Sequence, residues 1–419
     1  MSRDRDRTDD SRIESRSALS IESLELSRRE ALSLSTAAGL GLVAGVPLIL
    51  GSENIAEAAK RAPQVPTRTL GRTGKKIPIL LVGGSIRLDM RFDPKLAECF
   101  RYGVNYFDVA DCYAGGTSET AVGNFLKRAN LRKKSWITSK SDATDPAGFE
   151  ATVNQTLKKM QTNYIDMYFL HGIDNPAVLS PAMKAMQAKL KKQGKIHFFG
   201  FSCHGGNVVD CLNKAVQVGY VDAIMFRYNF RQYGNSALNK AMDACHKANI
   251  GLIAMKTQGS ASSFKGKWSP LVRSGKWTPH QAVLKAVWND KRITAAVSKM
   301  DTLTKVRQNI AAALNRKKLS QREMDALIRY AKATQHLACD GCDHICHPAA
   351  GTALDIGSTM RFLMYHDVYG DHDEARALYR ALPAAARDVS GADLAAAHKA
   401  CPNNMDIAWH LARARTVLG

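Results

Sequence analysis

Eight short apolar runs, separated by helix-sized intervals, constrain the fold of this chain more than any other feature. Each run can form one buried strand. They span Ile77–Gly83, Tyr106–Ala110, Ser135–Ser139, Ile165–Leu170, Ile196–Ser202, Ala223–Tyr228, Gly251–Lys256 and Ile293–Val297. Strands that alternate with helices indicate parallel β/α units. Their number predicts closure into a (β/α)8 or TIM barrel.

An open dinucleotide-binding sheet is the competing architecture. No Gly-x-Gly-x-x-Gly turn follows the first run, which ends only in the pair Gly83-Gly84, and this disfavours an open sheet. The chain has 419 residues, of which 45% are hydrophobic, so a barrel of about 250 residues leaves room for an appendage. We predict a signal and linker over residues 1–64, a barrel over 65–335 and a helical, cysteine-bearing extension over 336–419.

The N-terminal segment has the character of a targeting signal, either disordered or helical. Arg28 and Arg29 precede the apolar, Gly-rich run Ala37–Gly51, an arrangement that resembles a twin-arginine export signal. The run is shorter than the ~20 residues of a membrane span, and Ala56–Ala59 offers a cleavage point. We therefore expect export to the periplasm without a stable membrane span. A disordered N-terminus with a chance arginine pair is the alternative.

The chain is basic, with 59 Lys and Arg residues against 38 Asp and Glu residues and a net charge of +21. Such a charge can indicate nucleic acid or another anionic partner. The basic residues are scattered, however, and no nucleic-acid motif or aromatic-studded basic stripe accompanies them. We interpret the charge as a solvated basic surface and expect no nucleic-acid partner.

Four polar residues lie at or just beyond the ends of successive runs: Asp108, Tyr113, Lys140 and His171. In a barrel these strand ends meet at one mouth. An acid, a phenol, an amine and an imidazole would then share a pocket suited to proton transfer. We expect Asp108 to keep Lys140 charged and Lys140 to stabilise the phenolate of Tyr113. The alternative is a structural ion pair beside a surface tyrosine and a core histidine.

The sequence around these residues resembles the aldo-keto reductase family. The segments GRTGKKIPILLVGGS, GVNYFDVADCYAGGTSETAVG, TNYIDMYFLHGID and IHFFGFSCHGG carry the resemblance, which extends over Val65–Leu314. It implies a barrel that binds NADP(H) and reduces a small-molecule carbonyl substrate. By the same resemblance Asp108, Tyr113, Lys140 and His171 are catalytic, with Tyr113 as the proton donor.

The resemblance also implies six cofactor contacts, namely Ser202, Tyr228, Lys299, Lys305, Gln308 and Asn309. The tyrosine would stack on the nicotinamide, the serine would hold its carboxamide and the two amides would lie at the adenine. Two lysines at the 2′-phosphate favour NADP over NAD. For Lys305, an ordinary basic helix start is the alternative. Many relatives have Ser-Asn where this chain has Ser202-Cys203-His204, so His204 could contact the substrate instead.

A cysteine group follows the predicted barrel. Cys339, Cys342 and Cys346 are spaced C-x2-C-x3-C, and Cys401 precedes a proline. Four such thiolates suit one [4Fe-4S] cluster, and the segment resembles the ferredoxin-like extension of one aldo-keto reductase branch. Zinc is an alternative, with Cys401, His344 or His347 completing the ligand set, and disulfides are a second alternative.

These features leave two further hypotheses for the function. The protein could be an electron-transfer enzyme that couples a nicotinamide to the metal centre and a redox partner protein. It could also be a nicotinamide-binding sensor module without turnover. Residues Met360–Arg415 have helical periodicity, and we expect this segment to pack near the barrel mouth.

Overall fold

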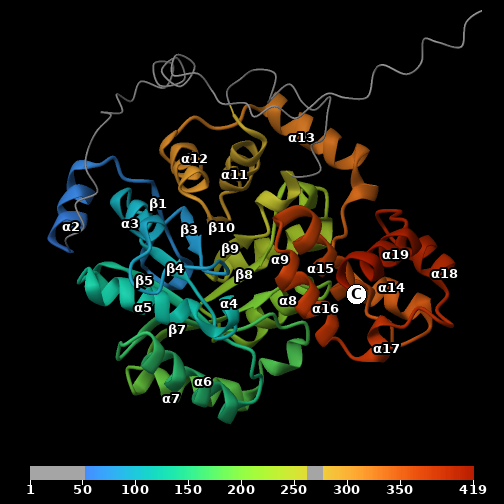
Figure 1. Ribbon diagram of the computed structural model, residues 1–419, viewed down its shortest axis with the longest axis horizontal. Helices are drawn as coiled ribbons and strands as arrows, with labels where there is room; N and C mark the ends of the chain where they lie inside the picture. The colour runs from blue at the N-terminus through green and yellow to red at the C-terminus, as the bar shows by residue number, and fades with distance from the viewer. Residues whose placement is uncertain (1–51, 262–276) are drawn as a thin grey trace, which may run out of the picture. The chain divides into compact units, whose positions relative to one another are not determined.

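The computed structural model describes residues 52–261 and 277–419 (Figure 1). Arg28, Arg29 and Ala37–Gly51 lie outside the described residues, so export stays a prediction. Ala56 and Ala59 lie in helix α2 (Ser52–Arg61) and pack against the large apolar core that lies between the sheet and the surrounding helices. Within the described part of the chain, no helix is both long and apolar enough to cross a membrane.

Eight parallel strands close into a barrel, as predicted. They are β3 (Leu80–Gly83), β4 (Tyr106–Asp108), β5 (Trp136–Ser141), β6 (Ile165–Leu170), β7 (Ile196–Cys203), β8 (Ala223–Arg227), β9 (Gly251–Met255) and β10 (Ile293–Lys299). Neighbours pair in the order β10-β3-β4-β5-β6-β7-β8-β9, and β10 also pairs with β9. This confirms the (β/α)8 fold.

The first apolar run differs from its prediction as a single strand. Its start forms β2 (Lys76–Pro78), which pairs antiparallel with β1 (Thr67–Thr69), and the barrel strand begins only at Leu80. Pro78 has no backbone N–H and favours such a break. Leu70 contacts Gly251, the first residue of β9, and joins the core inside the barrel together with Ile77. The hairpin therefore covers the N-terminal ends of the strands and leaves the opposite end as the mouth.

Several of the helices around the barrel begin at N-terminal capping residues that can be recognised in the sequence. They are α3 (Pro94–Arg101), α5 (Ser118–Arg128), α6 (Pro146–Lys159), α7 (Pro181–Lys192), α8 (Val208–Val218), α9 (Ser236–Lys247), α11 (Pro279–Asn289) and α12 (Leu303–Leu314). In α3, α6 and α7 a capping side chain, Asp93, Asp145 or Ser180, accepts a backbone N–H and a proline follows it. These caps define where each strand-to-helix connection ends.

Strand alternation sorts side chains between two apolar cores. On β8, Met225 joins the core inside the barrel, whereas Phe226 joins the core between sheet and helices. Successive side chains of a strand point to opposite faces. Continuing the pattern, Arg227 faces the mouth, and Tyr228 belongs to the outer core.

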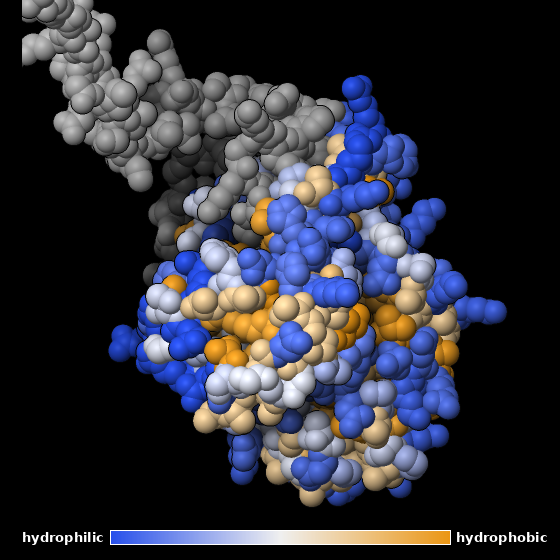
Figure 2. All heavy atoms as spheres, turned by 90° about the vertical axis from the view of Figure 1, so that its right-hand side faces the viewer, coloured by the Kyte–Doolittle hydropathy of each residue, from blue (hydrophilic) through white to orange (hydrophobic). Residues whose placement is uncertain are grey.

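The C-terminal extension is helical, with apolar clusters of its own. It comprises α13 (Gln321–Ala333), α14 (Asp343–Ala350), α15 (Ile356–Tyr369), α16 (His372–Ala381), α17 (Ala384–Arg387), α18 (Leu394–Ala400) and α19 (Ile407–Leu418). Figure 2 shows apolar side chains gathered in a band that hydrophilic residues border. The extension bonds to residues at the C-terminal ends of β8, β9 and β10, so it lies against the barrel mouth.

Candidate active site at the barrel mouth

A buried ion pair lies at the ends of two neighbouring strands. Asp108 ends β4 and Lys140 lies near the end of β5, with Lys140 Nζ 2.8 Å from Asp108 Oδ1 and side-chain exposures of 1% and 4%. Lys140 also donates to the carbonyl oxygen of Val109 at 2.8 Å. Burial raises the pKa of Asp108 although the charge of Lys140 opposes it. The pair places a cation at the mouth.

Tyr113 and His171 complete the group that the sequence predicts. Tyr113 follows β4, and its ring centroid lies 4.5 Å from Lys140 Nζ. His171 follows β6, and its ring meets the Tyr113 ring edge-to-face at 5.4 Å. The turn after Tyr113 is tight, because Ala114 adopts a left-handed φ of 52° and two glycines follow. The fold therefore brings all four predicted residues together.

The ionisation of Tyr113 differs from the expectation that Lys140 stabilises its phenolate. Burial, followed by the charge of Asp108, raises the pKa of Tyr113 well above its ordinary value. The reason is geometric, because Lys140 faces the ring and is already paired with Asp108. The phenol therefore keeps its proton at neutral pH and can donate it.

His171 is held by a carboxylate that sequence reasoning missed. Its Nδ1 lies 2.6 Å from Asp142 Oδ1, and Cys112 Sγ lies 3.6 Å from the same nitrogen. The hydrogen bond to His171 lowers the pKa of Asp142. Asp142 stands two residues beyond Lys140, and this position just past a strand end was the available signal. With Nδ1 engaged, Nε2 of His171 is left for a further partner.

Two of the residues expected to bind a cofactor lie near the ends of β7 and β8. Ser202 is buried, and its Oγ accepts the backbone N–H of Gly172 at 2.8 Å. Tyr228 is 1% exposed and donates to Asp290 Oδ2 at 2.7 Å. Because its side chain belongs to the outer core, Tyr228 does not face the mouth, and stacking on a nicotinamide there is incompatible with this conformation. Arg227 occupies the inward position instead.

The other expected residues lie at the end of β10 and on α12. Asn309 is buried, donates to Ser298 Oγ at 2.9 Å and accepts from Gln258 Nε2 at 2.9 Å. Lys305 pairs with Asp301 at 2.8 Å on the surface, and the exposed Gln308 accepts a hydrogen bond from Gln281 through its backbone carbonyl. Gln258, Ser298 and Asn309 form a hydrogen-bonded cluster of side chains, of which the sequence predicted only Asn309 as a site residue.

The remaining expected residue, Lys299, forms an ion pair with Asp371 of the extension. Nearby, a Cβ built on Gly259 would lie 2.5 Å from Tyr369 Oη, so this tyrosine rests on the loop after β9. Loops after the last two strands of TIM barrels frequently bind phosphate. Here a carboxylate of the extension occupies that end of the mouth.

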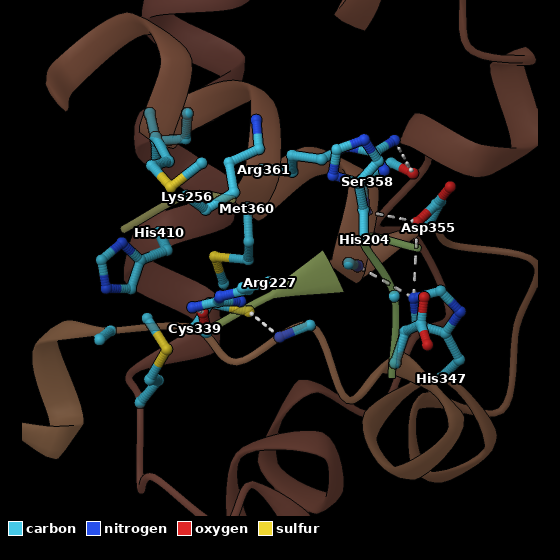
Figure 3. Close-up of a pocket in the computed structure, with 18 of the residues that line it drawn as sticks. His204, Arg227, Lys256, Cys339, His347, Asp355, Ser358, Met360, Arg361 and His410 are labelled. Carbon is cyan, nitrogen blue, oxygen red and sulfur yellow. Dashed lines mark hydrogen bonds and ion pairs between the residues drawn. The ribbon is translucent and has the colours of Figure 1, made fainter. Parts of the chain in front are cut away.

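A cavity of about 1190 Å³ lies between the strand ends and the extension (Figure 3). Its lining includes His204, Arg227 and Lys256 from the barrel and Cys339 and Arg361 from the extension. Burial, followed by the charges of Lys256 and Arg361, lowers the pKa of His204 well below its ordinary value. The cavity therefore holds a neutral imidazole beside these cations.

Comparison with known proteins identifies the barrel segment. The sequence profile of the aldo/keto reductase family matches residues 94–267, which include Asp108, Tyr113, Lys140 and His171. The chain contains an aldo/keto reductase domain. The matching residues run from the first residue of α3 past the end of β9.

Curated relatives of this aldo/keto reductase domain share about a quarter of its residues. L-galactose dehydrogenase of Arabidopsis thaliana is 26% identical over 210 residues, which cover 46% of this chain and 65% of the relative. An aldo-keto reductase of Gibberella moniliformis is 27% identical over 179 residues, covering 40% and 51%. The chain thus spans less than two thirds of either relative.

Solved structures of similar fold also belong to aldo-keto reductases. The holo form of an aldo-keto reductase from Bacillus halodurans superposes with a TM-score of 0.54 at 20% identity, covering 64% of this chain and 97% of that one. An aldo-keto reductase from Klebsiella pneumoniae in complex with NADPH gives 0.53 at 22% identity, covering 64% and 95%. These likenesses concern the fold.

Beyond the aldo/keto reductase domain, the four extension cysteines are free thiols near one another. Burial raises the pKa of Cys342 to about 12 and of Cys346 to about 11, and neighbouring sulfurs act in the same direction. Cys339, Cys346 and Cys401 pack against one apolar cluster of the extension, and Cys339 Sγ accepts the backbone N–H of Gly341 at 3.4 Å. An amide directed at sulfur suits a thiolate that binds metal.

The same cysteines are not gathered as zinc ligands are. Tetrahedral zinc with Zn–S of about 2.3 Å keeps its sulfurs about 3.8 Å apart. Across residues 52–261 and 277–419, only Asp111, Cys112, Asp142 and His171 form a group whose ligand atoms all lie within 4.8 Å of one another. The extension cysteines do not form such a group among the described residues.

Proposed function

We propose that the protein is an NADP-dependent reductase that converts a small-molecule carbonyl compound to an alcohol. The observation that carries the proposal is the Tyr113 ring held between Lys140 and His171 at the barrel mouth. The aldo/keto reductase profile and a relative named as a dehydrogenase support this reaction class. When bound, NADPH supplies the hydride that reaches the carbonyl carbon.

The residues of the chain supply the proton and orient the substrate. Tyr113 donates its phenolic proton to the carbonyl oxygen, and its raised pKa ensures that this proton is present at neutral pH. Lys140, paired with the buried Asp108, lies over the Tyr113 ring and fixes the position of that ring at the mouth. His171, fixed by Asp142, donates to or orients the carbonyl oxygen.

The cofactor phosphate has a fitting position beside Lys299. That lysine already binds an anion there, the Asp371 carboxylate, which stands in for a phosphate oxygen. Gln258, Ser298 and Asn309 offer amide and hydroxyl groups at the neighbouring strand ends. We therefore assign the phosphate-bearing half of NADP to the ends of β9 and β10, with Asp371 as a competitor.

Replacing Tyr113 tests the proton donor. Tyr113→Phe should lower kcat for reduction of a test aldehyde by about 100-fold or more, because general acid catalysis contributes roughly that much. NADPH affinity, measured by fluorescence titration, should stay within about twofold, since the hydroxyl meets the substrate rather than the cofactor. Tyr220→Phe, which removes a hydroxyl bonded to the backbone of Ser180, is the control. Unchanged turnover in Tyr113→Phe would exclude this residue as the donor.

Removing the competing carboxylate tests the cofactor site. Asp371→Asn should tighten NADPH binding about three- to tenfold, because it frees Lys299 from an ion pair. Lys299→Gln should weaken binding by a comparable factor. Asp373→Asn, a fully solvated carboxylate two residues away, serves as control and should leave the Kd unchanged. Equal affinity for wild type and Asp371→Asn would refute the competition.

A second candidate function is electron transfer between a nicotinamide and an iron–sulfur centre with a redox partner protein. The supporting observation is that Cys339 lines the same cavity as His204 and Arg227. We propose that Cys339, Cys342, Cys346 and Cys401 hold one [4Fe-4S] cluster, whose chemistry would be one-electron transfer.

Metal analysis of anaerobically purified protein tests the cluster. We expect about four iron and four sulfide per chain, with an EPR signal on reduction. Cys401→Ser should lose most of the iron, because it removes one of four ligands. Cys245→Ser, a buried thiol between barrel helices, should keep it. Absence of iron from the wild-type protein would eliminate the cluster and with it the electron-transfer function.

A further inference from the structure

Besides Arg231, which donates to Thr334, three cations from different elements line the cavity at the barrel mouth (Figure 3). Arg227 ends β8, Lys256 follows β9 and Arg361 lies on α15. Burial lowers the pKa of Lys256, and the positive charges of Arg361 and Arg227 lower it further, against the effect of Tyr365. Arg361 and Arg227 are therefore close enough to Lys256 to disfavour its charge.

Two of these cations lack a carboxylate partner in the described part of the chain. Lys256 donates to the hydroxyl of Tyr365 at 2.7 Å. Arg361 donates only to the hydroxyl of Ser358, at 3.3 Å. Arg227 bonds to the backbone of Cys339 and lies 3.4 Å from Asp340. Partly buried positive charges that neighbour one another are costly unless an anion binds between them.

Four aspartates also line the cavity: Asp174, Asp343, Asp355 and Asp367. Asp355 caps α15 by accepting the N–H of Ser358 at 2.8 Å and lies 3.5 Å from His347. Asp367 forms a two-point pair with Arg413 at 2.8 Å. Among the described residues none of the four pairs with Lys256 or Arg361, so these two cations are left for an anionic ligand.

His204 connects this cavity to the reacting group. It extends from the end of β7, lines the cavity and places its ring 6.2 Å from the ring of His171. Its Nδ1 is buried without a hydrogen-bond partner among the described residues. A buried polar atom left unpaired in a cavity lining is expected where a ligand supplies the partner.

We propose that the cavity binds an anionic group of the carbonyl substrate, a carboxylate or a phosphate, through Arg361, Lys256 and Arg227. The inference rests on the proposed reductase function and specifies its substrate class as short aldehydes or ketones that carry a negative charge. Guanidinium groups bind such oxyanions in two-point contacts. The substrate then extends past His204, so that its carbonyl group reaches His171 and Tyr113.

A matched pair of aldehydes tests this substrate class. Succinic semialdehyde and butanal share a four-carbon chain and an aldehyde, and differ in the terminal carboxylate. We expect wild type to show a kcat/KM about tenfold or more higher for succinic semialdehyde, equivalent to about 1.4 kcal/mol. Arg361→Gln should reduce that ratio at least about fivefold, whereas Arg361→Lys should retain part of it because it keeps the charge. Arg322→Gln, on the exposed face of α13, is the control.

Two parallel binding measurements separate the possible outcomes. A ratio near one in wild type would overturn the proposal. A loss of NADPH affinity in Arg361→Gln with an unchanged aldehyde ratio would assign the anion to the cofactor instead, and would also overturn it. If neither aldehyde is reduced, the reductase function fails, and calorimetry with succinate decides this inference. Binding to wild type that Arg361→Gln abolishes would support an anion site, and no binding would refute it.

Discussion

Closure of eight parallel strands is the constraint on which the rest of the molecule depends. Because every strand runs in the same direction, their C-terminal ends meet at one mouth, and the hairpin of β1 and β2 covers the other end. Asp108, Lys140 and His171 come from three successive strands and could not otherwise converge. The buried Asp108–Lys140 pair then has its partners fixed by sheet register, and removal of either would leave a buried charge at a cost of about 3–5 kcal/mol.

The extension uses the same mouth in two ways. At the ends of β9 and β10 it covers the surface, through Asp371 on Lys299 and Tyr369 on Gly259. At the ends of β7 and β8 it encloses a cavity, to which it contributes Arg361. Helix α15 carries Arg361, which we assign to the substrate anion. The turn after this helix carries Asp371, which pairs with Lys299 where we place the cofactor phosphate. On these two proposals, cofactor affinity and substrate choice both depend on the packing of the extension.

Periodic features of the sequence predicted the barrel and the polar group at its mouth. Apolar runs at helix-sized spacing specified all eight strands, and β6 has the same bounds as its run. Prediction was less successful where a shift of one residue along a strand changes the face to which a side chain points. Tyr228 is next to Arg227, and only the observed strand alternation shows which of the two side chains faces the mouth. Contacts such as that of Asp371 with Lys299 join residues far apart in the sequence, and no local sequence pattern predicts them. The raised pKa of Tyr113 likewise depends on burial and on the direction of Lys140, neither of which spacing reveals.

We propose that a hydride passes directly from a nicotinamide to a carbonyl carbon at this mouth. Reduction of a test aldehyde with NADPH deuterated at both C4 positions, followed by mass spectrometry of the alcohol, tests this transfer most directly. We expect one deuterium on the former carbonyl carbon for each NADPH oxidised. Oxidation of NADPH with formation of an alcohol that carries only solvent hydrogen would contradict it, because electrons would then have travelled separately from the proton.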